Sequence, residues 1–321
     1  MKDLEAAWTA AMRRGDFAAA WAAGDRLLAR NVAAGSCAHW PRHRQWVWDG
    51  RPLEGRRLLV RCYHGLGDTI QFVRYIPRLR ARAAQVLLWA QPALMPLLSG
   101  LPGLDQLLPL HDGDPGVARD VDVEIMELPY LFRTTIDAVS HRVPYLSVDP
   151  LPVGRGHGPA VGLVWRAGDW ANHRSIPFQL LGPLLAAPVT WYVLQGGAGL
   201  EERPAGFGTA AGTDDILEAA RVIASLDLLI TIDSMPAHLA GALAAPVWTL
   251  LAADADWRWM IGREDTPWYP TMRLFRQERA GEWGPVIERV AHELHGFIRG
   301  TGVHGNPPAA PPLPLGSDGE R

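Results

Sequence analysis

The fold is decided by residues 226–241, which read LDLLITIDSMPAHLAG. The first seven residues are almost all apolar, which predicts a short strand buried on both faces, as strands of parallel sheets are. Pro236 suits the first turn of a helix, where its missing N–H is not needed, so we expect a helix over 236–243. A buried strand that leads into a helix indicates an α/β protein with a parallel sheet.

The same alternation of strand and helix recurs along the chain. In the second half, strands are predicted at 160–165, 190–194 and 247–251, and helices at 177–186, 214–225 and 283–298. In the first half, strands are predicted at 58–63, 86–90, 106–110 and 121–126, and helices at 69–82 and 92–99. Such alternation indicates parallel sheets with helices on their faces.

A Pro- and Gly-rich segment, 144–159, separates the two halves as an interdomain linker would. The length of 321 residues also suits two domains of ~100–200 residues each. We therefore expect two Rossmann-like, doubly wound domains, over 36–150 and 151–299, that face each other across a cleft.

The two ends of the chain differ from this pattern. Residues 1–35 are Ala-rich, and their helical spacing breaks at Gly15-Asp16, which predicts a short helical hairpin. The spacing is that of one tetratricopeptide-type unit, and a plain helical cap fits it as well. A single unit cannot bury its apolar face alone, so it must pack on this protein or on a partner. Residues 300–321 are Gly- and Pro-rich without periodicity and predict a disordered tail.

Composition excludes several classes of protein. The formal net charge is −3 and arginines are interleaved with acids, which disfavours a nucleic-acid partner. Cys37 and Cys62 lie in no metal-ligand pattern, which disfavours a disulfide scaffold and a zinc site. The N-terminus is too charged for a signal peptide, and no run approaches about 18 apolar residues. We expect a cytoplasmic protein without a transmembrane segment; peripheral attachment at the inner membrane stays open.

The loop after the deciding strand is the first candidate site, because ligands of open α/β sheets bind beyond the carboxyl ends of the strands. Ser234 is a candidate N-cap, and a helix N-terminus attracts phosphate through its free N–H groups. His238 falls in the first turn, where it either adds a donor or packs between helix and sheet. Asp233 either accepts hydrogen bonds from a ribose or braces the turn.

A second candidate is the glycine loop His64-Gly65-Leu66-Gly67-Asp68 after the first strand. Two glycines allow a tight turn and a close approach of ligand. Asp68 is either an N-cap or a general base that takes a proton from an acceptor hydroxyl. The third glycine of a dinucleotide fingerprint is missing, so an NAD-dependent enzyme is disfavoured.

A third candidate is the segment around Arg174, which follows strand 160–165. An arginine there either clamps a diphosphate with its fork of donors or is solvated at the surface. Asp254 and Asp256 come nearest to an Asp-x-Asp pair, but they precede Trp257-Arg258-Trp259 where a helix is expected, so no metal is expected. Helix N-termini and cations would then stabilise the diphosphate. Residues 254–277 are dense in Trp, Arg and acids; they either wall the pocket or pack the domains together, and packing is favoured for most of the aromatic residues.

As a set, these segments resemble glycosyltransferase family 9, which includes the heptosyltransferases, and more closely bacterial proteins in which tetratricopeptide repeats precede such a domain. The resemblance covers roughly residues 40–298. It is carried by RCYHGLGDTIQF (61–72), VGLVW (161–165), RSIP (174–177), IDS (232–234) with AHLAG (237–241), and WYPTMRLFRQ (268–277).

The resemblance implies a GT-B fold and an inverting, metal-independent transfer from a nucleotide sugar, without a cofactor. It implies a catalytic role for Asp68, donor contacts and an acceptor-side loop. The implied donor-binding residues are Arg174, Gln195, Asp233, Ser234 and His238, and the implied loop residues are His64, Gly65, Gly67 and Gln71. The nucleotide (ADP, UDP, GDP or CMP) and the acceptor, a cell-surface glycan or a protein, stay open.

Three features depart from the family pattern. The loop 166–174 is short, Met235-Pro236 replaces smaller residues, and Gln195-Gly196-Gly197 lacks the lysine that often follows the glutamine. Each departure removes a potential phosphate contact. The alternative function is therefore a degenerate, non-catalytic scaffold or binding protein.

Overall fold

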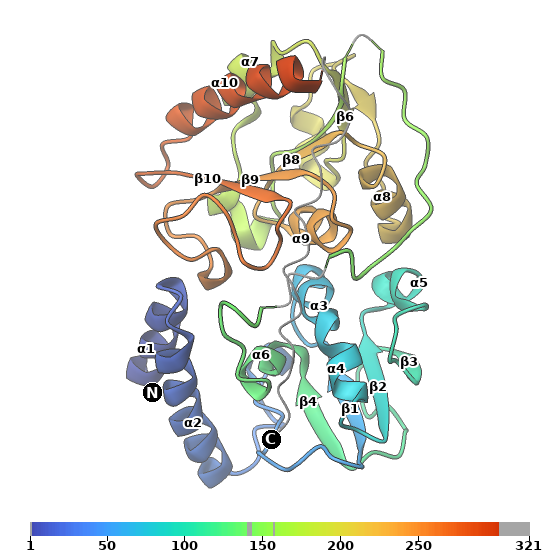
Figure 1. Ribbon diagram of the computed structural model, residues 1–321, viewed down its shortest axis with the longest axis vertical. Helices are drawn as coiled ribbons and strands as arrows, with labels where there is room; N and C mark the ends of the chain where they lie inside the picture. Colours follow the sequence, from blue (N-terminus) through green and yellow to red (C-terminus); the bar gives the residue numbers. More distant parts are fainter. Residues whose placement is uncertain (1, 140–142, 157, 302–321) are drawn as a thin grey trace, which may run out of the picture.

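The computed structural model describes residues 2–139, 143–156 and 158–301. Its strands form two parallel sheets, one in each half of the chain. In Figure 1 the second half lies above the first, and a pair of N-terminal helices runs alongside. The α/β architecture with two parallel sheets is therefore confirmed.

The first sheet has the order β3-β2-β1-β4, and all its pairings are parallel. Every residue of its second strand except the first is buried, as expected for a strand covered on both faces. The strands are β1 (Arg57–Arg61), β2 (Gln85–Ala90), β3 (Gln106–Pro109) and β4 (Val121–Glu124).

The second sheet has the order β10-β9-β8-β5-β6-β7, again with parallel pairings. Its central strands β5 and β8 are buried along their whole length, which explains why their sequences are mostly apolar. The strands are β5 (Ala160–Val164), β6 (Thr190–Val193), β7 (Thr209–Ala210), β8 (Leu228–Ile232), β9 (Val247–Leu251) and β10 (Met272–Arg276).

The helices of the first half are shorter than expected. The predicted helix 69–82 is divided into α3 (Leu66–Phe72), a 3₁₀ turn η2 (Val73–Tyr75) and α4 (Ile76–Arg80). Pro77 lies in the first turn of α4 and lacks the N–H that a continuous helix would need there. The predicted helix 92–99 is likewise a 3₁₀ turn η3 (Pro92–Leu94) followed by α5 (Met95–Leu98). After β4 come η4 (Ile125–Glu127) and α6 (Leu128–Leu131).

The second half contains α8 (Ile216–Ile223), α9 (Met235–Ala242) and the closing α10 (Gly284–Thr301), close to their predicted positions. The predicted helix 177–186 is a 3₁₀ turn η6 (Phe178–Leu181) followed by α7 (Gly182–Leu185). The other 3₁₀ turns are η5 (Asp169–Arg174), η7 (Gly197–Glu202) and η8 (Trp257–Trp259), and η1 (Arg42–Arg44) lies in the segment before β1.

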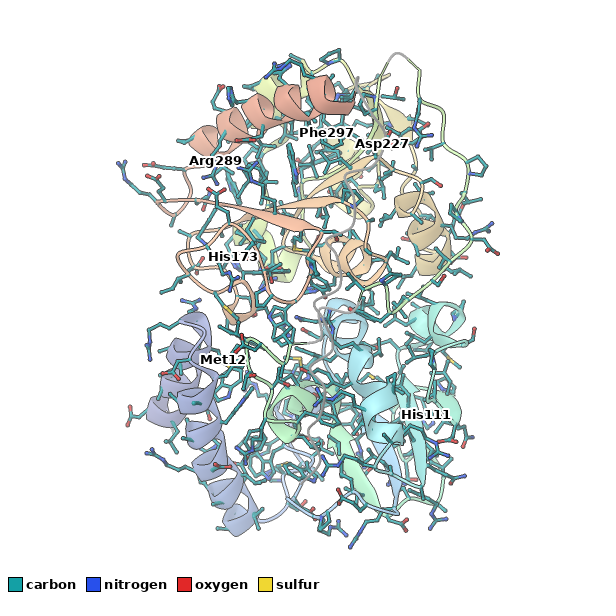
Figure 2. All side chains as sticks on the ribbon, viewed as in Figure 1. Met12, His111, His173, Asp227, Arg289 and Phe297 are labelled. Atoms are coloured by element: carbon teal, nitrogen blue, oxygen red, sulfur yellow. The ribbon has the colours of Figure 1, made fainter. Side chains whose placement is uncertain are left out.

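The N-terminal hairpin is formed by α1 (Lys2–Arg13) and α2 (Phe17–Ala34) and packs on the body of the protein. Figure 2 shows Met12 on the side of α1 that faces the rest of the molecule. The Trp21 indole N–H donates to the Thr134 carbonyl at 2.6 Å in the first half. The Arg13 guanidinium donates to the Asp254 carbonyl at 2.9 Å in the second half. The hairpin thus ties the two halves together.

The remaining expectations concern the stretch 254–277, the tail and a membrane span. Strand β10 lies inside the Trp- and Arg-rich stretch 254–277, where no strand was predicted. Most aromatic residues of that stretch are buried, as expected for a packing role. The predicted tail lies outside the described residues from 302 onward. In the part of the chain that is described, no helix has the length and apolar character needed to cross a bilayer.

Candidate functional site

A cavity of about 500 Å³ lies between the two halves. Loops at the carboxyl ends of β5, β6 and β8 line it on one side, and the start of α3 lines it on the other. Most of the sequence-predicted site residues come together there. They are Gly65, Gly67, Asp68, Arg174, Gln195, Asp233, Ser234 and His238.

The N-terminus of α9 faces this cavity. Ser234 occupies the N-cap position, as predicted, with extended backbone angles of φ −157° and ψ 177°. Its hydroxyl makes no capping bond and instead donates to the Ile232 carbonyl at 3.3 Å. The start of α9 therefore presents the positive end of its dipole without a side-chain cap, which is the arrangement that attracts an anion.

The buried Asp233 forms an ion pair with the half-buried Arg174 beside the helix start. The Arg174 Nη1 lies 3.3 Å from the Asp233 Oδ2, and it also donates to the Asp233 carbonyl at 3.4 Å. Burial raises the pKa of Asp233, and the charge of Arg174 opposes that rise. Arg174 ends the 3₁₀ turn η5 instead of standing on the surface, so the structure gives this arginine a place in the cavity wall.

His238 is buried where the two halves meet. Its Nδ1 lies 2.9 Å from the Tyr269 hydroxyl, and its ring stacks on Trp259 with centroids 5.3 Å apart. Burial, with help from the charge of Arg258, lowers the pKa of His238 to about 3. The ring is therefore neutral at physiological pH and offers the cavity a hydrogen-bonding group but no charge. The ring is packed between the two halves and also lines the cavity.

Gly67 explains how the two halves approach so closely. A Cβ at this position would lie 2.7 Å from the His238 Cδ2, closer than real Cβ contacts allow. Only a glycine lets the first turn of α3 lie directly against α9.

Asp68 is the third residue of α3, and Gly65 holds the N-cap position. The Asp68 Oδ2 accepts the Gly65 N–H at 2.8 Å, which is one half of a capping box. Its Oδ1 accepts a short hydrogen bond from Arg258, and 23% of the side chain remains exposed at the cavity. The carboxylate therefore braces its own loop and also faces the space between the halves.

Arg258 is the site residue that the sequence did not single out. Its Nε donates to the Gln71 Oε1 at 2.7 Å and its Nη1 to the Asp256 Oδ1 at 2.7 Å, while its Nη2 pairs with Asp68. Only 7% of the side chain is exposed. Burial works against the charge, but Asp256 and Asp68 outweigh it and raise the pKa of Arg258. The sequence signal was the stretch Asp256-Trp257-Arg258-Trp259, which gave no hint of a partner 190 residues away.

Two predicted residues, Gln195 and Gln71, form hydrogen bonds that fix neighbouring parts of the site. The Gln195 Oε1 accepts the N–H groups of Trp165 at 3.1 Å and Arg166 at 2.9 Å, and its Nε2 donates to the Arg166 and Gly196 carbonyls. Gln195 thus fastens the end of β5 to the end of β6. Gln71 is fully buried and does not line the cavity; it orients Arg258.

His64 lies on the far side of the glycine loop and faces a different cavity. Its Nδ1 lies 3.0 Å from the Oε1 of Glu124, at the carboxyl end of β4. Burial alone would lower the pKa of His64, but the hydrogen bond and charge of Glu124, with the charge of Asp68, raise it.

Asp254 and Asp256, the nearest sequence match to a metal-binding pair, have other partners in the structure. Asp256 pairs with Arg258, and the Asp254 carbonyl is bound by Arg13. Burial opposes ionisation of Asp256, but Arg258 outweighs it, so the pKa of Asp256 is lowered. Among the described residues, no group of three or more His, Cys, Asp or Glu side chains is arranged to hold a metal ion.

Comparison with known proteins gives one curated relative and several structural neighbours. Protein FlbA of Caulobacter vibrioides is 29% identical over 291 residues, which cover 78% of this chain and 48% of FlbA. The chain thus spans about half the length of the curated relative that it matches.

Two solved structures share the fold at low sequence identity. A family 9 glycosyl transferase from Veillonella parvula has a TM-score of 0.53 at 13% identity, covering 78% of this chain and 98% of its own. The ADP-heptose lps heptosyltransferase II of E. coli has a TM-score of 0.52 at 14% identity, covering 77% and 100%. Residues 199–282 match the model of glycosyltransferase family 9 (heptosyltransferase). Residues 199–282 are therefore similar to glycosyltransferase family 9, and the chain shares a GT-B fold with these two structures.

Proposed function

We propose that this chain transfers a hexosyl- or heptosyl-type sugar from a nucleotide sugar to a hydroxyl of a glycan or protein acceptor, with inversion and without a required metal ion. The observation that carries the proposal is the cavity between the halves. An uncapped helix N-terminus and an arginine from the second half face a carboxylate from the first half across it. The family 9 match and the fold support the same reaction class.

On the donor side, the diphosphate binds at the start of α9 and beside Arg174. Amide dipoles and a guanidinium are suited to the negative charge that builds on a departing nucleotide. His238 is neutral because of its low pKa, so it contributes a hydrogen bond only. Asp233 holds Arg174 in place by the 3.3 Å ion pair, and the Gln195 contacts fix the neighbouring loop.

On the acceptor side, Asp68 is the proposed catalytic carboxylate. It faces the cavity from α3 while α9 faces it from the other half, so a sugar bound by its diphosphate at α9 lies between them. An acceptor oxygen that attacks the anomeric carbon opposite the leaving diphosphate inverts the configuration there.

Isothermal titration calorimetry with ADP-heptose and with UDP-, GDP- and CMP-sugars tests donor binding. ADP-heptose comes first because the structural neighbour from E. coli is described as an ADP-heptose transferase. We expect one donor to bind equally well with and without a chelator. Absence of heat with all four nucleotides would instead support the scaffold alternative.

The variant Asp68→Asn tests the catalytic part separately. It keeps the size of the side chain and an oxygen for the Gly65 N–H, but it loses the negative charge. Turnover of the donor identified by calorimetry should fall below detection while the donor's Kd stays within about twofold. Full turnover in Asp68→Asn would remove Asp68 from the mechanism.

A further inference from the structure

The N-terminal hairpin touches both halves of the molecule, although the chain joins it directly to the first half alone. Residues 35–56 lead from the end of α2 to the start of β1. Gly15, in the turn between α1 and α2, lies at the boundary between the halves. A Cβ placed there would be 2.9 Å from the Ile136 Cδ1 of the first half and 3.4 Å from the Met260 Sδ of the second.

Helix α2 anchors the hairpin on the first half. The ring of Trp21 packs on that of Tyr130 with centroids 5.9 Å apart. The Asp25 carboxylate accepts hydrogen bonds from the Tyr130 hydroxyl at 2.7 Å and from the Arg133 guanidinium at 2.5 Å. These contacts, with the bond from Trp21 to the Thr134 carbonyl, make the hairpin part of the first half.

The end of α1 holds one loop of the second half, residues 254–261, which contains η8. The Arg13 guanidinium donates to the carbonyls of Asp254 at 2.9 Å and Ala255 at 3.0 Å. The Arg13 carbonyl accepts the N–H of Ile261 at 2.9 Å. One residue of the hairpin therefore binds both ends of this loop.

The turn η8 is held between the hairpin and α3. The ring of Trp257 meets that of Trp8 edge to face at 5.2 Å, and it stacks on that of Phe72 at 6.3 Å with 8° between the planes. Phe72 is the last residue of α3, the helix that carries Asp68. Arg258, the next residue of η8, pairs with Asp68. The first half thus grips the turn that carries Arg258 from two sides.

The hairpin has no direct part in donor binding. Among the described residues that line the cavity of about 500 Å³, none belongs to α1 or α2. The proposed phosphate-binding groups, the start of α9 and Arg174, both belong to the second half, whereas Asp68 reaches the cavity from the first. The arrangement of the two halves therefore sets the distance from Asp68 to a bound donor, but it does not shape the phosphate wall.

We infer that the hairpin is a positioning strap: by holding η8 against α3, it keeps Arg258 on Asp68 and fixes the first half over the donor site before any ligand binds. The inference rests on the proposed transferase function and gives the hairpin a role in it. Trp8 and Arg13 are positioning residues, because they act on Asp68 only through η8. Loosening the strap should therefore lower kcat and spare donor affinity.

Arg13→Gln tests the strap with little change to the buried face of the hairpin. Hydrolysis of the donor identified by calorimetry, with water as the acceptor, measures kcat. We expect kcat to fall about 10- to 100-fold, because a small misplacement of a catalytic group costs that much, while the donor's Kd stays within about twofold. Arg13→Lys, which can still donate to carbonyls, should recover part of the loss. Arg14→Gln is the matched control, since its neighbouring side chain is exposed, and should behave as the wild type.

Trp8→Ala is the second variant and removes the ring that covers Trp257. Because this change can lower the folded fraction, calorimetry counts the donor sites per chain and kcat is expressed per site. A merely structural role for Trp8 would lower the number of sites and leave kcat per site unchanged. The strap predicts a lower kcat per site with an unchanged Kd.

Double electron–electron resonance measures the placement of the halves without any substrate. Spin labels are attached at Ala84→Cys in the first half and His292→Cys in the second, both exposed positions, while the two native cysteines are buried. We expect a narrow distance distribution that a bound donor does not shift. Adding Arg13→Gln or Trp8→Ala should broaden it.

The strap and the transferase function fail in different ways. Wild-type kcat per site in both variants, with an unchanged distance distribution, would overturn the strap and leave the transferase function intact. A weaker donor affinity with unchanged kcat would also overturn it, since the hairpin would then act on the second half alone. If no nucleotide sugar binds, the transferase function fails, and the distance distributions alone decide whether the hairpin fixes the halves.

Discussion

The two halves of the molecule use the carboxyl ends of their strands in different ways. In the second half, the start of α9, Arg174 and a neutral His238 form a wall that can hold negative charge without exchanging protons near neutral pH. In the first half, Asp68 presents a carboxylate to the same cavity, with 23% of its side chain exposed and Arg258 as its partner. The comparison suits the function proposed above, in which the second half binds the diphosphate and the first half supplies the catalytic carboxylate.

Arg258 is the point where the two halves are joined electrostatically. It comes from the second half, pairs with Asp68 of the first, and is almost fully buried. The hairpin strengthens the same junction, because Trp8 of α1 packs edge to face on Trp257 with centroids 5.2 Å apart. The proposed division of roles therefore depends on an ion pair, Arg258–Asp68, that fixes the two halves relative to each other.

The largest expected effect comes from Arg258→Gln, which removes the ion pair between the two halves. It leaves Asp68 and Asp256 without their common cation, so we expect a loss of about 3–5 kcal/mol in the free energy of unfolding and no turnover. Urea denaturation measures the first quantity. Arg279→Gln is the control, since its pair with Glu282 is exposed and should change stability by less than about 1 kcal/mol. Equal effects of the two variants would show that Arg258 does not join the halves.

Arg174→Gln tests the charge-holding wall of the second half. Loss of one charge-assisted hydrogen bond to the diphosphate should weaken the donor by about 1.5–3 kcal/mol, or roughly 10- to 100-fold in Kd. Calorimetry should give this loss, with partial recovery in Arg174→Lys. Arg155→Gln serves for comparison, because Arg155 pairs with Asp227 on the surface. An unchanged Kd in Arg174→Gln would move the diphosphate away from this wall.

Gly67→Ala tests the close contact between the halves. The added Cβ would lie 2.7 Å from the His238 ring, so α3 and α9 must shift apart. We expect destabilisation of about 1–3 kcal/mol by urea unfolding, together with a weaker donor affinity. Gly100→Ala, where the new Cβ would meet nothing within 4 Å, controls for the change of residue type. If both variants are equally stable, the halves are less tightly apposed than described.

The effect that is smallest at neutral pH concerns His238 and the pH dependence of stability. The folded-state pKa of His238 is about 3 and the ordinary value is 6.5, so the unfolded chain binds the proton first. This residue therefore lowers stability as pH falls from 6.5 toward 3, by at most about 1.4 kcal/mol per pH unit. In His238→Gln the slope of unfolding free energy against pH should flatten over this window. An unchanged slope would mean that the imidazole is not held neutral.

Much of the fold could be predicted from local sequence. The runs 160–164 and 228–232 are buried along their whole length and are mostly apolar, so their pattern is easy to recognise. β10 was missed because Arg273 and Arg276 interrupt its apolar residues. Helix lengths were overestimated because the helical spacing of apolar residues continues through Pro77. Proline lacks the backbone N–H that a continuous helix needs at this position, so the helix is divided there.

The site could be predicted only as separate loops. The sequence indicated the helix start at Ser234 and the glycine loop at Asp68, since each directly follows a predicted strand. It could not indicate the pairing of Arg258 with Asp68, nor that of His64 with Glu124, which lie 190 and 60 residues apart. Such pairs depend on strand order and on how the halves pack, which no local pattern encodes.

A crystal structure of the protein with ADP-heptose, or with the donor that calorimetry selects, tests the division between the halves most directly. We predict that the diphosphate lies at the N-terminus of α9, within hydrogen-bond distance of the Arg174 guanidinium, and that the sugar points toward Asp68. A diphosphate bound against the first half, or far from both Ser234 and Arg174, would contradict it.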